Sequence, residues 1–389
     1  MKQLRNLIFG QSGIVLAGSL MILSALVVAG LAARMMLQND HRTAANLRHG
    51  SQAFYLAASG IEWGKSELLS FNGLTPAPAD RSVNFSNGRF SVFFVSALSV
   101  GPLSAQFVVR SLGVLNSDSH ALQAGLTKSY DLSDGALGLR GNVQAVNFGG
   151  TVVAVSGVDH DSASGQPTGL ISALPAVSTD SQSMSDLVRL QTASLPAASL
   201  QSDSGDTAVL PSRHLSSATV SQLADQLCAA PGAVNLPIPS SGALTLASQN
   251  WGTPATPQLR CVDGLSGTGD GVTLSGDSTG AGILIVRNAD LLLNGLFRWE
   301  GLIIVSGSDV GIKTGALSST NIFGSIILNE TGNPASGAAI LDLQGSFRSV
   351  FSRAALNRAG GLIPISALGA LYASLPSSIR QDYWRSVSP

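Results

Sequence analysis

The sequence has few charged residues and very few cysteines. Charged side chains make up 12% of the 389 residues, with 22 Lys and Arg against 23 Asp and Glu. A typical soluble domain carries about 25% charged residues. Because there is no basic excess to neutralise phosphates, we expect no nucleic-acid partner. The two cysteines exclude a disulfide-dense mini-protein and a four-cysteine zinc site.

Small residues take the place of the missing charges. The chain contains 43 glycines, 44% hydrophobic residues and only 5% aromatic residues. Apolar positions are therefore separated by Gly, Ser, Thr and Ala, which is not typical of a cytosolic helical protein. The length is sufficient for one large domain or two ordinary ones, each with its own core.

One long uncharged run lies near the N-terminus, from Ile14 to Ala33. About twenty apolar residues suffice for a helix to cross the roughly 30 Å hydrocarbon core of a bilayer. The run is too long for the apolar region of an ordinary secretory signal, which has about 7 to 15 residues. Lys2 and Arg5 precede it, but Arg34 and other arginines follow it, so charge alone leaves the orientation open.

Residues 34–70 continue in helical composition without proline and stop at the turn signal Asn72-Gly73. Apolar residues recur there every seven positions, at Leu47, Phe54, Ile61 and Leu68. This spacing forms one narrow stripe, which predicts a helix docked on a globular core through those four side chains. The glycines at positions 50, 60 and 64 indicate close packing or a locally imperfect helix.

The remainder of the chain is predicted to be rich in strands. Residues 88–95 and 105–112 are typical strands of a first sheet, and short apolar runs separated by Gly, Asn and Asp follow from residue 135. The later runs favour a parallel β-helix, with a β-sandwich as the alternative. We interpret the Ser/Ala/Thr/Pro-rich residues 162–260 as an insertion, with one helix from Ser216 or Ser217 to Ala229, and residues 376–384 as a terminal helix.

The helix resembles a known family in two segments, Ala45-Asn46-Leu47-Arg48 and Ala53 to Trp63. With the basic leader and the apolar run, they are similar to the type IV pilin superfamily, and in particular to PilX-type minor pilins. The resemblance implies an α+β fold: a leader at residues 1–13, a helix at 14–70 with a transmembrane part at 14–33, a pilin-like sheet at 71–135 and a β-rich head at 136–389. It also implies that a prepilin peptidase cuts after Gly13 and methylates Ile14; cleavage after Gly10 is the alternative.

One position departs from the pattern of major pilins. They usually carry Glu at the fifth mature residue, where it pairs with the amino terminus of a neighbouring subunit, whereas this sequence has Gly18. Tip subunits commonly lack this Glu, so the resemblance implies a position at the filament tip.

The resemblance implies a non-enzymatic minor pilin without a cofactor, which primes pilus assembly and mediates adhesion or motility. Its partners would be other minor pilins, the major pilin, the prepilin peptidase and the inner-membrane assembly platform. We expect a single-pass inner-membrane protein with a periplasmic head that later reaches the pilus tip. The alternatives are a tip pseudopilin of type II secretion and a membrane-anchored β-helix protein that acts on or binds polysaccharide.

Few residues are candidates for chemistry. Gly276 to Gly280 match G-x-S-x-G, but a strand follows and no histidine comes later, so we expect a turn. Asp159 and Asp161 form a weak calcium candidate, for which a structural turn is the alternative, and no metal site is otherwise expected. Cys228 and Cys261, in a chain predicted to enter an oxidising compartment, are expected to form a disulfide.

Overall fold

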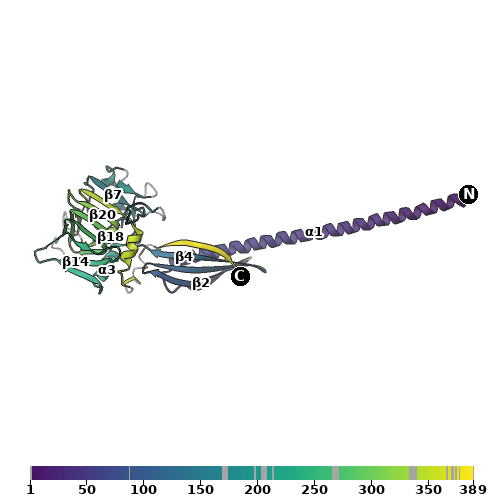
Figure 1. The fold of residues 1–389 in the computed structure, drawn as a ribbon, viewed down its shortest axis with the longest axis horizontal. Coiled ribbons are helices and arrows are strands. Elements are labelled where there is room, and N and C mark those ends of the chain that lie inside the picture. Colours follow the sequence, from purple (N-terminus) through teal and green to yellow (C-terminus); the bar gives the residue numbers. More distant parts are fainter. Residues whose placement is uncertain are drawn as a thin grey trace.

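The computed structural model describes residues 2–388 except 87, 169–173, 197–198, 203–207, 213, 265–270, 333–339, 365–366, 369–371, 373–374 and 376, with side chains described from residue 16 onward. The protein consists of a long helix, an antiparallel sheet and a larger winding of parallel strands (Figure 1). This is the α+β class expected from the sequence, with a long N-terminal helix and a β-rich head.

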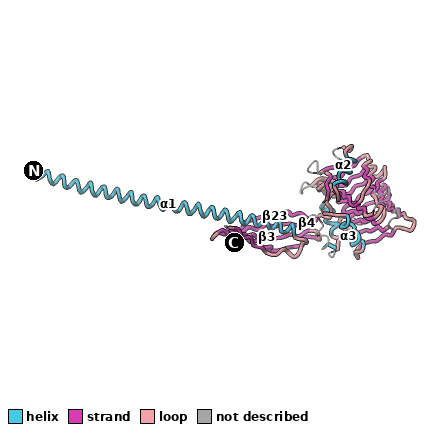
Figure 2. The backbone as a smooth tube through the Cα atoms, turned by 180° about the vertical axis from the view of Figure 1, so that it is seen from behind, coloured by secondary structure: helices cyan, strands magenta, loops and turns pink. Residues whose placement is uncertain are grey.

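Helix α1 (Lys2–Ser70) is the longest element, and most of it extends away from the rest of the molecule (Figures 1 and 2). Its 69 residues correspond to about 100 Å at a rise of 1.5 Å per residue. No proline interrupts it, and beyond its end Gly73 has a φ of +133°, which residues with a Cβ rarely adopt. The apolar and amphipathic segments predicted from the sequence therefore form one continuous helix.

The C-terminal part of α1 lies on a five-stranded antiparallel sheet, here called the helix-docking sheet, in the order β1-β2-β3-β4-β23. Its strands are β1 (Arg81–Phe85), β2 (Gly88–Gly101), β3 (Ser104–Leu115), β4 (Asp118–Tyr130) and β23 (Ser377–Val387). Apolar residues alternate along these strands and are buried toward the helix, among them Phe90, Val92 and Val109. The sheet thus supplies the core on which α1 is docked.

Strand β23 corrects the prediction of a terminal helix over residues 376–384. The segment instead pairs antiparallel with β4, from Ser377 beside Tyr130 to Val387 beside Ala121. It contains aromatic residues that favour strands, and the edge of β4 offers it a full set of backbone partners. These long-range hydrogen bonds outweigh a weak local preference for helix. The sheet is therefore completed by the C-terminal end of the chain, which the sequence-based domain boundaries had assigned to the head.

The head is a parallel β-helix, which decides between the two architectures left open by the sequence. A twelve-stranded large sheet follows the order β10-β8-β5-β20-β18-β16-β14-β11, with β13, β22, β7 and β9 attached to it, and a six-stranded small sheet follows β12-β15-β17-β19-β21-β6. The strands are β5 (Leu137–Gly141), β6 (Ala145–Asn147), β7 (Val152–Ser156), β8 (Val177–Thr179), β9 (Leu200–Gln201), β10 (Val209–Pro211), β11 (Ala233–Pro237), β12 (Ala243–Ala247), β13 (Asn250–Trp251), β14 (Gln258–Asp263), β15 (Gly271–Ser275), β16 (Ser278–Arg287), β17 (Asp290–Asn294), β18 (Leu296–Gly307), β19 (Ile312–Thr314), β20 (Ser319–Glu330), β21 (Ile340–Asp342) and β22 (Ser346–Val350).

Three glycines form one corner of the β-helix. Gly282, Gly301 and Gly324 are in register on β16, β18 and β20 and have φ values of +120°, +137° and +140°. A Cβ at Gly301 would overlap the carbonyl group of Gly282 on the neighbouring strand. Glycine is therefore required where these long strands bend from one face to the next.

The coils of the β-helix are not stacked in chain order. Strand β5 lies between β20 and β8, so the chain enters the stack in its interior. It then builds β8 to β10 at one end, crosses to β11 at the opposite end, and winds back until β20, β21 and β22 pair with β5, β6 and β7. Residues 162–260, predicted to be an insertion, thus include strands at both ends of the β-helix.

Three short helices complete the head: α2 (Gln182–Thr192), α3 (Ser217–Cys228) and α4 (Arg353–Gly360). Each begins after a serine whose side chain accepts a hydrogen bond from the first turn. The helix predicted from Ser216 or Ser217 to Ala229 is confirmed, with Ser216 as N-cap and Ala229 as C-cap. Helix α3 crosses the large sheet, where it contacts β11, β14, β16, β18 and β20, and it carries the chain between the two ends of the β-helix.

Candidate functional site

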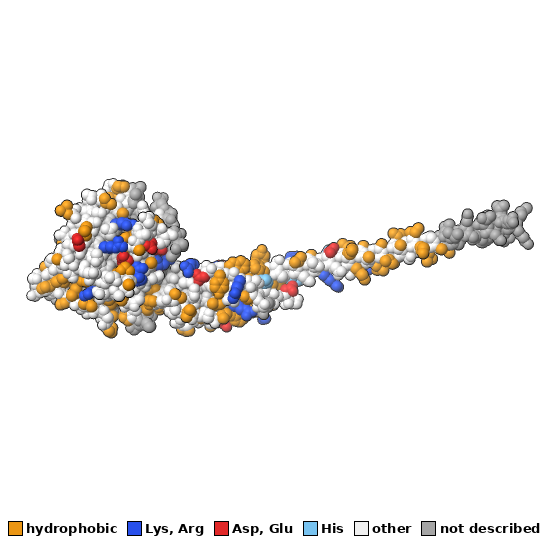
Figure 3. All heavy atoms as spheres, in the orientation of Figure 1, with side chains coloured by type: hydrophobic (Ala, Val, Ile, Leu, Met, Phe, Trp, Pro, Cys, Tyr) orange, Lys and Arg blue, Asp and Glu red, His pale blue; other side chains and the backbone are white. Residues whose placement is uncertain are grey.

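The free half of α1 is the most unusual surface of the molecule. Its large apolar side chains from Leu16 to Leu37 are each between 54% and 76% exposed. Figure 3 shows hydrophobic side chains along this part of the helix, beyond the compact head. A helix that is apolar all round is normally buried in a membrane or among other helices. By length and composition, α1 is able to cross a membrane.

Polar groups within this apolar half are satisfied locally. The hydroxyls of Ser19 and Ser24 donate to the carbonyl oxygens of Leu16 and Met21, both at 2.9 Å. Such bonds to the preceding turn allow serine to lie in a medium that lacks water. Gly18, where the sequence departs from the pattern of major pilins, has no atom within 4 Å of a Cβ built on it, apart from its own helix backbone and chain neighbours. Gly13 and Ile14 lie within α1, but their side chains are outside the described part of the chain.

The docked half of α1 contacts the helix-docking sheet mainly through small residues. Ala53, Ala57 and Leu68 are fully buried, and a Cβ on Gly64 would lie 3.1 Å from Val109 Cγ1. On the facing strand β3, a Cβ on Gly113 would lie 2.5 Å from the backbone nitrogen of Ala57. The helix and the sheet therefore approach each other at backbone distance.

The predicted stripe is only partly the contact face. Ile61 and Leu68 are buried and Phe54 is partly buried, but Leu47 is 68% exposed. The prediction for Leu47 was wrong because this residue lies on the N-terminal side of the segment of α1 that packs on the sheet. Gly50, like Gly18, faces open space, whereas Gly60 would place a Cβ 3.1 Å from Phe90 Cδ2.

The C-terminal end of α1 is held by two side chains of β4. The Lys128 ammonium donates to the carbonyl oxygen of Phe71, and the Tyr130 hydroxyl accepts from the Gly73 amide at 2.9 Å. The Lys128 side chain is fully buried and makes no ion pair with any described residue. Burial lowers the pKa of Lys128 to about 8, and burial raises the pKa of Tyr130. A cation here complements the negative end of the helix dipole and fixes where α1 stops.

The head joins the helix-docking sheet through a buried ion pair. Arg353 of α4 contacts both carboxylate oxygens of Asp131, directly after β4, at 2.8 Å each. Burial raises the pKa of Asp131, and the Arg353 guanidinium opposes that shift. Beside this pair, the rings of Tyr130 and Tyr372 pack at 4.6 Å. These contacts connect the two halves of the molecule directly.

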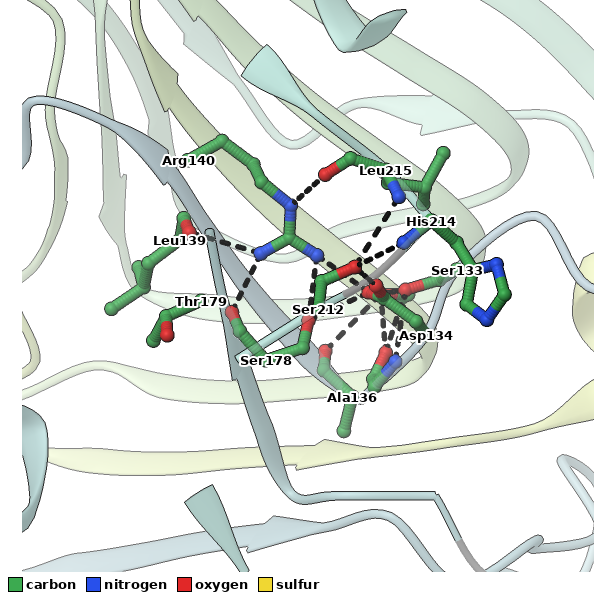
Figure 4. A network of polar contacts seen from close by, with 12 residues as sticks. Ser133, Asp134, Ala136, Leu139, Arg140, Ser178, Thr179, Ser212, His214 and Leu215 are labelled. Atoms are coloured by element: carbon green, nitrogen blue, oxygen red, sulfur yellow. Dashed lines mark hydrogen bonds and ion pairs between the residues drawn. The ribbon is translucent and has the colours of Figure 1, made fainter. Parts of the chain in front are cut away.

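A second buried network lies inside the head, where the sequence offered no signal for it. Arg140 donates to Asp134 at 2.6 Å, to the Leu215 carbonyl and to Ser178, while Ser212 donates to the other carboxylate oxygen of Asp134 (Figure 4). Figure 4 shows the His214 imidazole turned away from Asp134 and Ser212. Ser212 thus lacks an imidazole base, and the network connects β5 with the ends of β8 and β10.

The other sequence candidates are placed in structural roles. Cys228, at the end of α3, and Cys261, in β14, form a disulfide with Cα atoms 5.6 Å apart. Asp159 accepts from the Arg353 amide, and Asp161 accepts from the amides of Ala163 and Ser164 within a turn. Within the part of the chain that the structure describes, no three His, Cys, Asp or Glu side chains are grouped as a metal site would require.

The fold and the free half-helix define a class: an α+β protein with a membrane-length apolar helix docked on a β-rich head. No family model and no curated protein matches the chain. Among solved structures, it is similar to the competence-associated pilin ComZ from Thermus thermophilus, with 14% identity and a TM-score of 0.26 over 87% of this chain and 97% of that chain. A score of this size supports no inference from that pilin to this chain.

Proposed function

We propose that the chain is a minor pilin, a structural and non-enzymatic subunit of a type IV pilus. The proposal depends on one observation: α1 is exposed and apolar on all sides over one half, and docked on a sheet through small residues over the other. The first half is suited to a membrane before assembly and to partner helices afterwards, because both bury it equally well. The helix motifs shared with PilX-type minor pilins support the same role.

The proposed route starts in the inner membrane, with the head in the periplasm. A prepilin peptidase removes residues 1–13, and the assembly platform then moves the subunit into a filament with other minor pilins and the major pilin. Transfer of α1 from lipid to a helix bundle costs little because neither environment exposes its apolar side chains to water. The head remains outside the bundle and is available for adhesion or for contacts that promote motility.

Gly18 supports a position at the tip of the filament. A carboxylate at this position would need the amino terminus of a neighbouring subunit as its partner, since an unpaired buried charge is costly. A glycine needs no such partner, which fits a subunit at the end of the filament. Gly18→Glu is expected to move the protein from the tip into the shaft, as seen by immunogold labelling of pili. Tip-only labelling together with loss of pilus initiation would contradict this explanation.

The deciding experiment is mass spectrometry of the intact N-terminus, with and without co-expressed prepilin peptidase. The proposal predicts a mature chain that begins at N-methylated Ile14 only when the peptidase is present. An uncut Met1 would instead indicate a signal-anchored envelope protein. Cleavage near residues 28 to 33 would indicate an exported soluble protein, and either result would overturn the filament role.

A tip pseudopilin of type II secretion would give the same processed N-terminus. Deletion of the gene separates the two systems. Loss of twitching motility with normal exoprotein secretion supports the pilus, whereas loss of secretion with normal motility supports the pseudopilus.

A further inference from the structure

A shallow groove of about 350 Å³ lies on the outer face of the β-helix, across strands β16, β18 and β20. Its outward side chains are Asp277, Thr279, Leu296, Arg298, Ser319 and Asn321. Thr279, Arg298 and Asn321 are in register, so they repeat at the spacing of neighbouring strands, about 4.8 Å. The groove therefore presents a row of polar groups along the axis of the β-helix.

Four of these side chains have free hydrogen-bonding capacity. Asp277, Thr279, Ser319 and Asn321 make no side-chain hydrogen bond or ion pair with the residues that the structure describes. Some outward polar side chains elsewhere on the β-helix are instead paired with each other. On the small sheet, Lys313 contacts Asp290 at 2.6 Å and Asn147 donates to Asp342 at 2.9 Å.

Arg298 is held in place at the centre of the groove. Its guanidinium lies 4.6 Å from the Phe323 ring centroid, and Nη2 donates to the Ser162 carbonyl at 2.7 Å and to Glu300 at 3.0 Å. Its Nε and Nη1 make no hydrogen bond with the described residues. The side chain is thus fixed by three contacts and keeps donors available, so little conformational entropy is lost when it binds a ligand.

We propose that this groove binds a neutral polyhydroxylated ligand, namely an oligosaccharide chain lying across the strands. A peptide strand would need a free backbone edge, but β16, β18 and β20 are paired on both sides here. One carboxylate and one guanidinium line the groove, so it attracts neither a polyanion nor a polycation. Hydroxyl, amide and charged groups beside the exposed Leu296 match the mixture of hydroxyl groups and apolar ring faces that a sugar presents.

Display of this groove to the outside of the cell rests on the proposed filament role, but binding itself does not. The test therefore uses the full chain in micelles, where no assembly takes place. A zwitterionic detergent is required, because sugar-headed detergents would compete for the groove. If the N-terminal processing experiment fails, the sugar-binding test still stands. If no sugar binds, the processing experiment is equally unaffected.

The probes are cellohexaose, maltohexaose and chitohexaose, titrated by calorimetry. At least one is expected to bind saturably at millimolar concentrations or below. The double variant Thr279→Ala/Asn321→Ala is expected to bind about tenfold more weakly, since it loses the hydrogen bonds of two groups. Thr273→Ala, which removes an outward threonine of strand β15 in the small sheet, is the matched control and is expected to bind like the wild type.

Hydrogen exchange on the wild-type chain tests the same site without any substitution. Bound sugar is expected to protect residues 277–281, 296–300 and 319–323. The proposal is overturned if no hexasaccharide binds, if the folded double variant binds as tightly as the wild type, or if protection appears only elsewhere. Tighter, salt-sensitive binding of heparin would also overturn it, because the groove would then be an anion site.

Discussion

At the scale of single residues, glycine decides how α1 meets the sheet. A methyl group on Gly113 of β3 would overlap the α1 backbone, whereas one on Gly60 or Gly64 of the helix would press on side chains of the sheet. Gly50, four turns nearer the free half than Gly64, has no such neighbour. Glycine thus allows close packing at positions 60 and 64, whereas at position 50 it only lowers the stability of the helix.

A pair of alanine substitutions separates these two cases. Gly113→Ala is expected to lower the free energy of unfolding by about 2 to 3 kcal/mol, because the new methyl group overlaps the α1 backbone rather than a movable side chain. Gly50→Ala is expected to raise it by up to about 1 kcal/mol. Thermal melts of the full chain in detergent, followed by tryptophan fluorescence, compare the two. Equal melting temperatures for both variants would contradict the packing described here.

Lys128 is expected to make the free energy of unfolding change with pH in the alkaline range. Because burial lowers its pKa to about 8 in the folded state, the unfolded chain binds more protons between pH 8 and about 10.4. The free energy of unfolding should therefore rise with pH in that window, by at most about 1.4 kcal/mol per pH unit. The raised pKa values of Tyr130 and Tyr372 act in the opposite sense at higher pH.

Lys128→Met isolates this contribution. Unfolding in urea at pH 7.5, 8.5 and 9.5 is expected to show a rise for the wild type that the variant lacks. A variant with the same slope as the wild type would show that Lys128 remains charged throughout the window.

At the scale of elements, sequence patterns predicted those strands whose own residues favour a strand. The short apolar runs after residue 135 were expected to be strands, and β16, β18 and β20 are built from such runs. Their continuation around a glycine corner was not expected. Strand β23 and the end strands within residues 162–260 were missed, because their stability comes from distant backbone partners that leave no local signal.

In the candidate site, too, the features with a local sequence signal were predicted and those that depend on distant partners were not. Length and hydropathy were sufficient to predict the apolar half of α1. The contact face of the docked half was misjudged at Leu47, because an apolar stripe does not reveal where the sheet ends. The polar groove on the β-helix joins side chains from three strands, whose register no single segment of sequence encodes.

The disulfide joins the end of α3, which carries the chain between the two ends of the β-helix, to strand β14. Replacement of Cys228 and Cys261 by serine is expected to lower the free energy of unfolding by about 3 to 4 kcal/mol, the loop-closure contribution for a separation of 33 residues. Denaturant unfolding of the variant against the wild type measures this. Titration of the wild type without reductant should find no free thiol, and two titratable thiols would contradict the bond.

At the scale of the whole molecule, the β-helix is inserted between β4 and β23 of the helix-docking sheet. The chain leaves the sheet after Tyr130 and returns at Ser377, and these two residues are paired neighbours. Asp131 directly follows Tyr130, so its ion pair with Arg353 lies where the chain leaves the sheet and contributes to holding the two halves together.

Arg353→Leu is expected to cost about 3 to 5 kcal/mol at pH 7, because Asp131 is left buried without its partner. Burial already raises the pKa of Asp131 and Arg353 opposes this shift, so the variant raises it further. The loss should therefore be smaller at pH 5, where more of the carboxyl is protonated in the folded state.

Urea unfolding at the two pH values measures this effect. Asp131→Asn/Arg353→Leu serves as the control, since it removes both charges and should recover part of the stability without the pH dependence. A loss that is the same at both pH values would show that the carboxylate is not the cause.

The double crossing has a mechanical consequence. A pull that separates the head from the free end of α1 reaches the sheet through two neighbouring strands: β4, which continues covalently to α1 through β3, β2 and β1, and β23, which is held by its hydrogen bonds to β4. The hydrogen bonds between β4, β3 and β23 run across the strands, so a force along the strands shears many of them at once instead of opening them one by one. Tension on the head is therefore shared between the covalent path through β4 and the hydrogen bonds that hold β23 in the sheet.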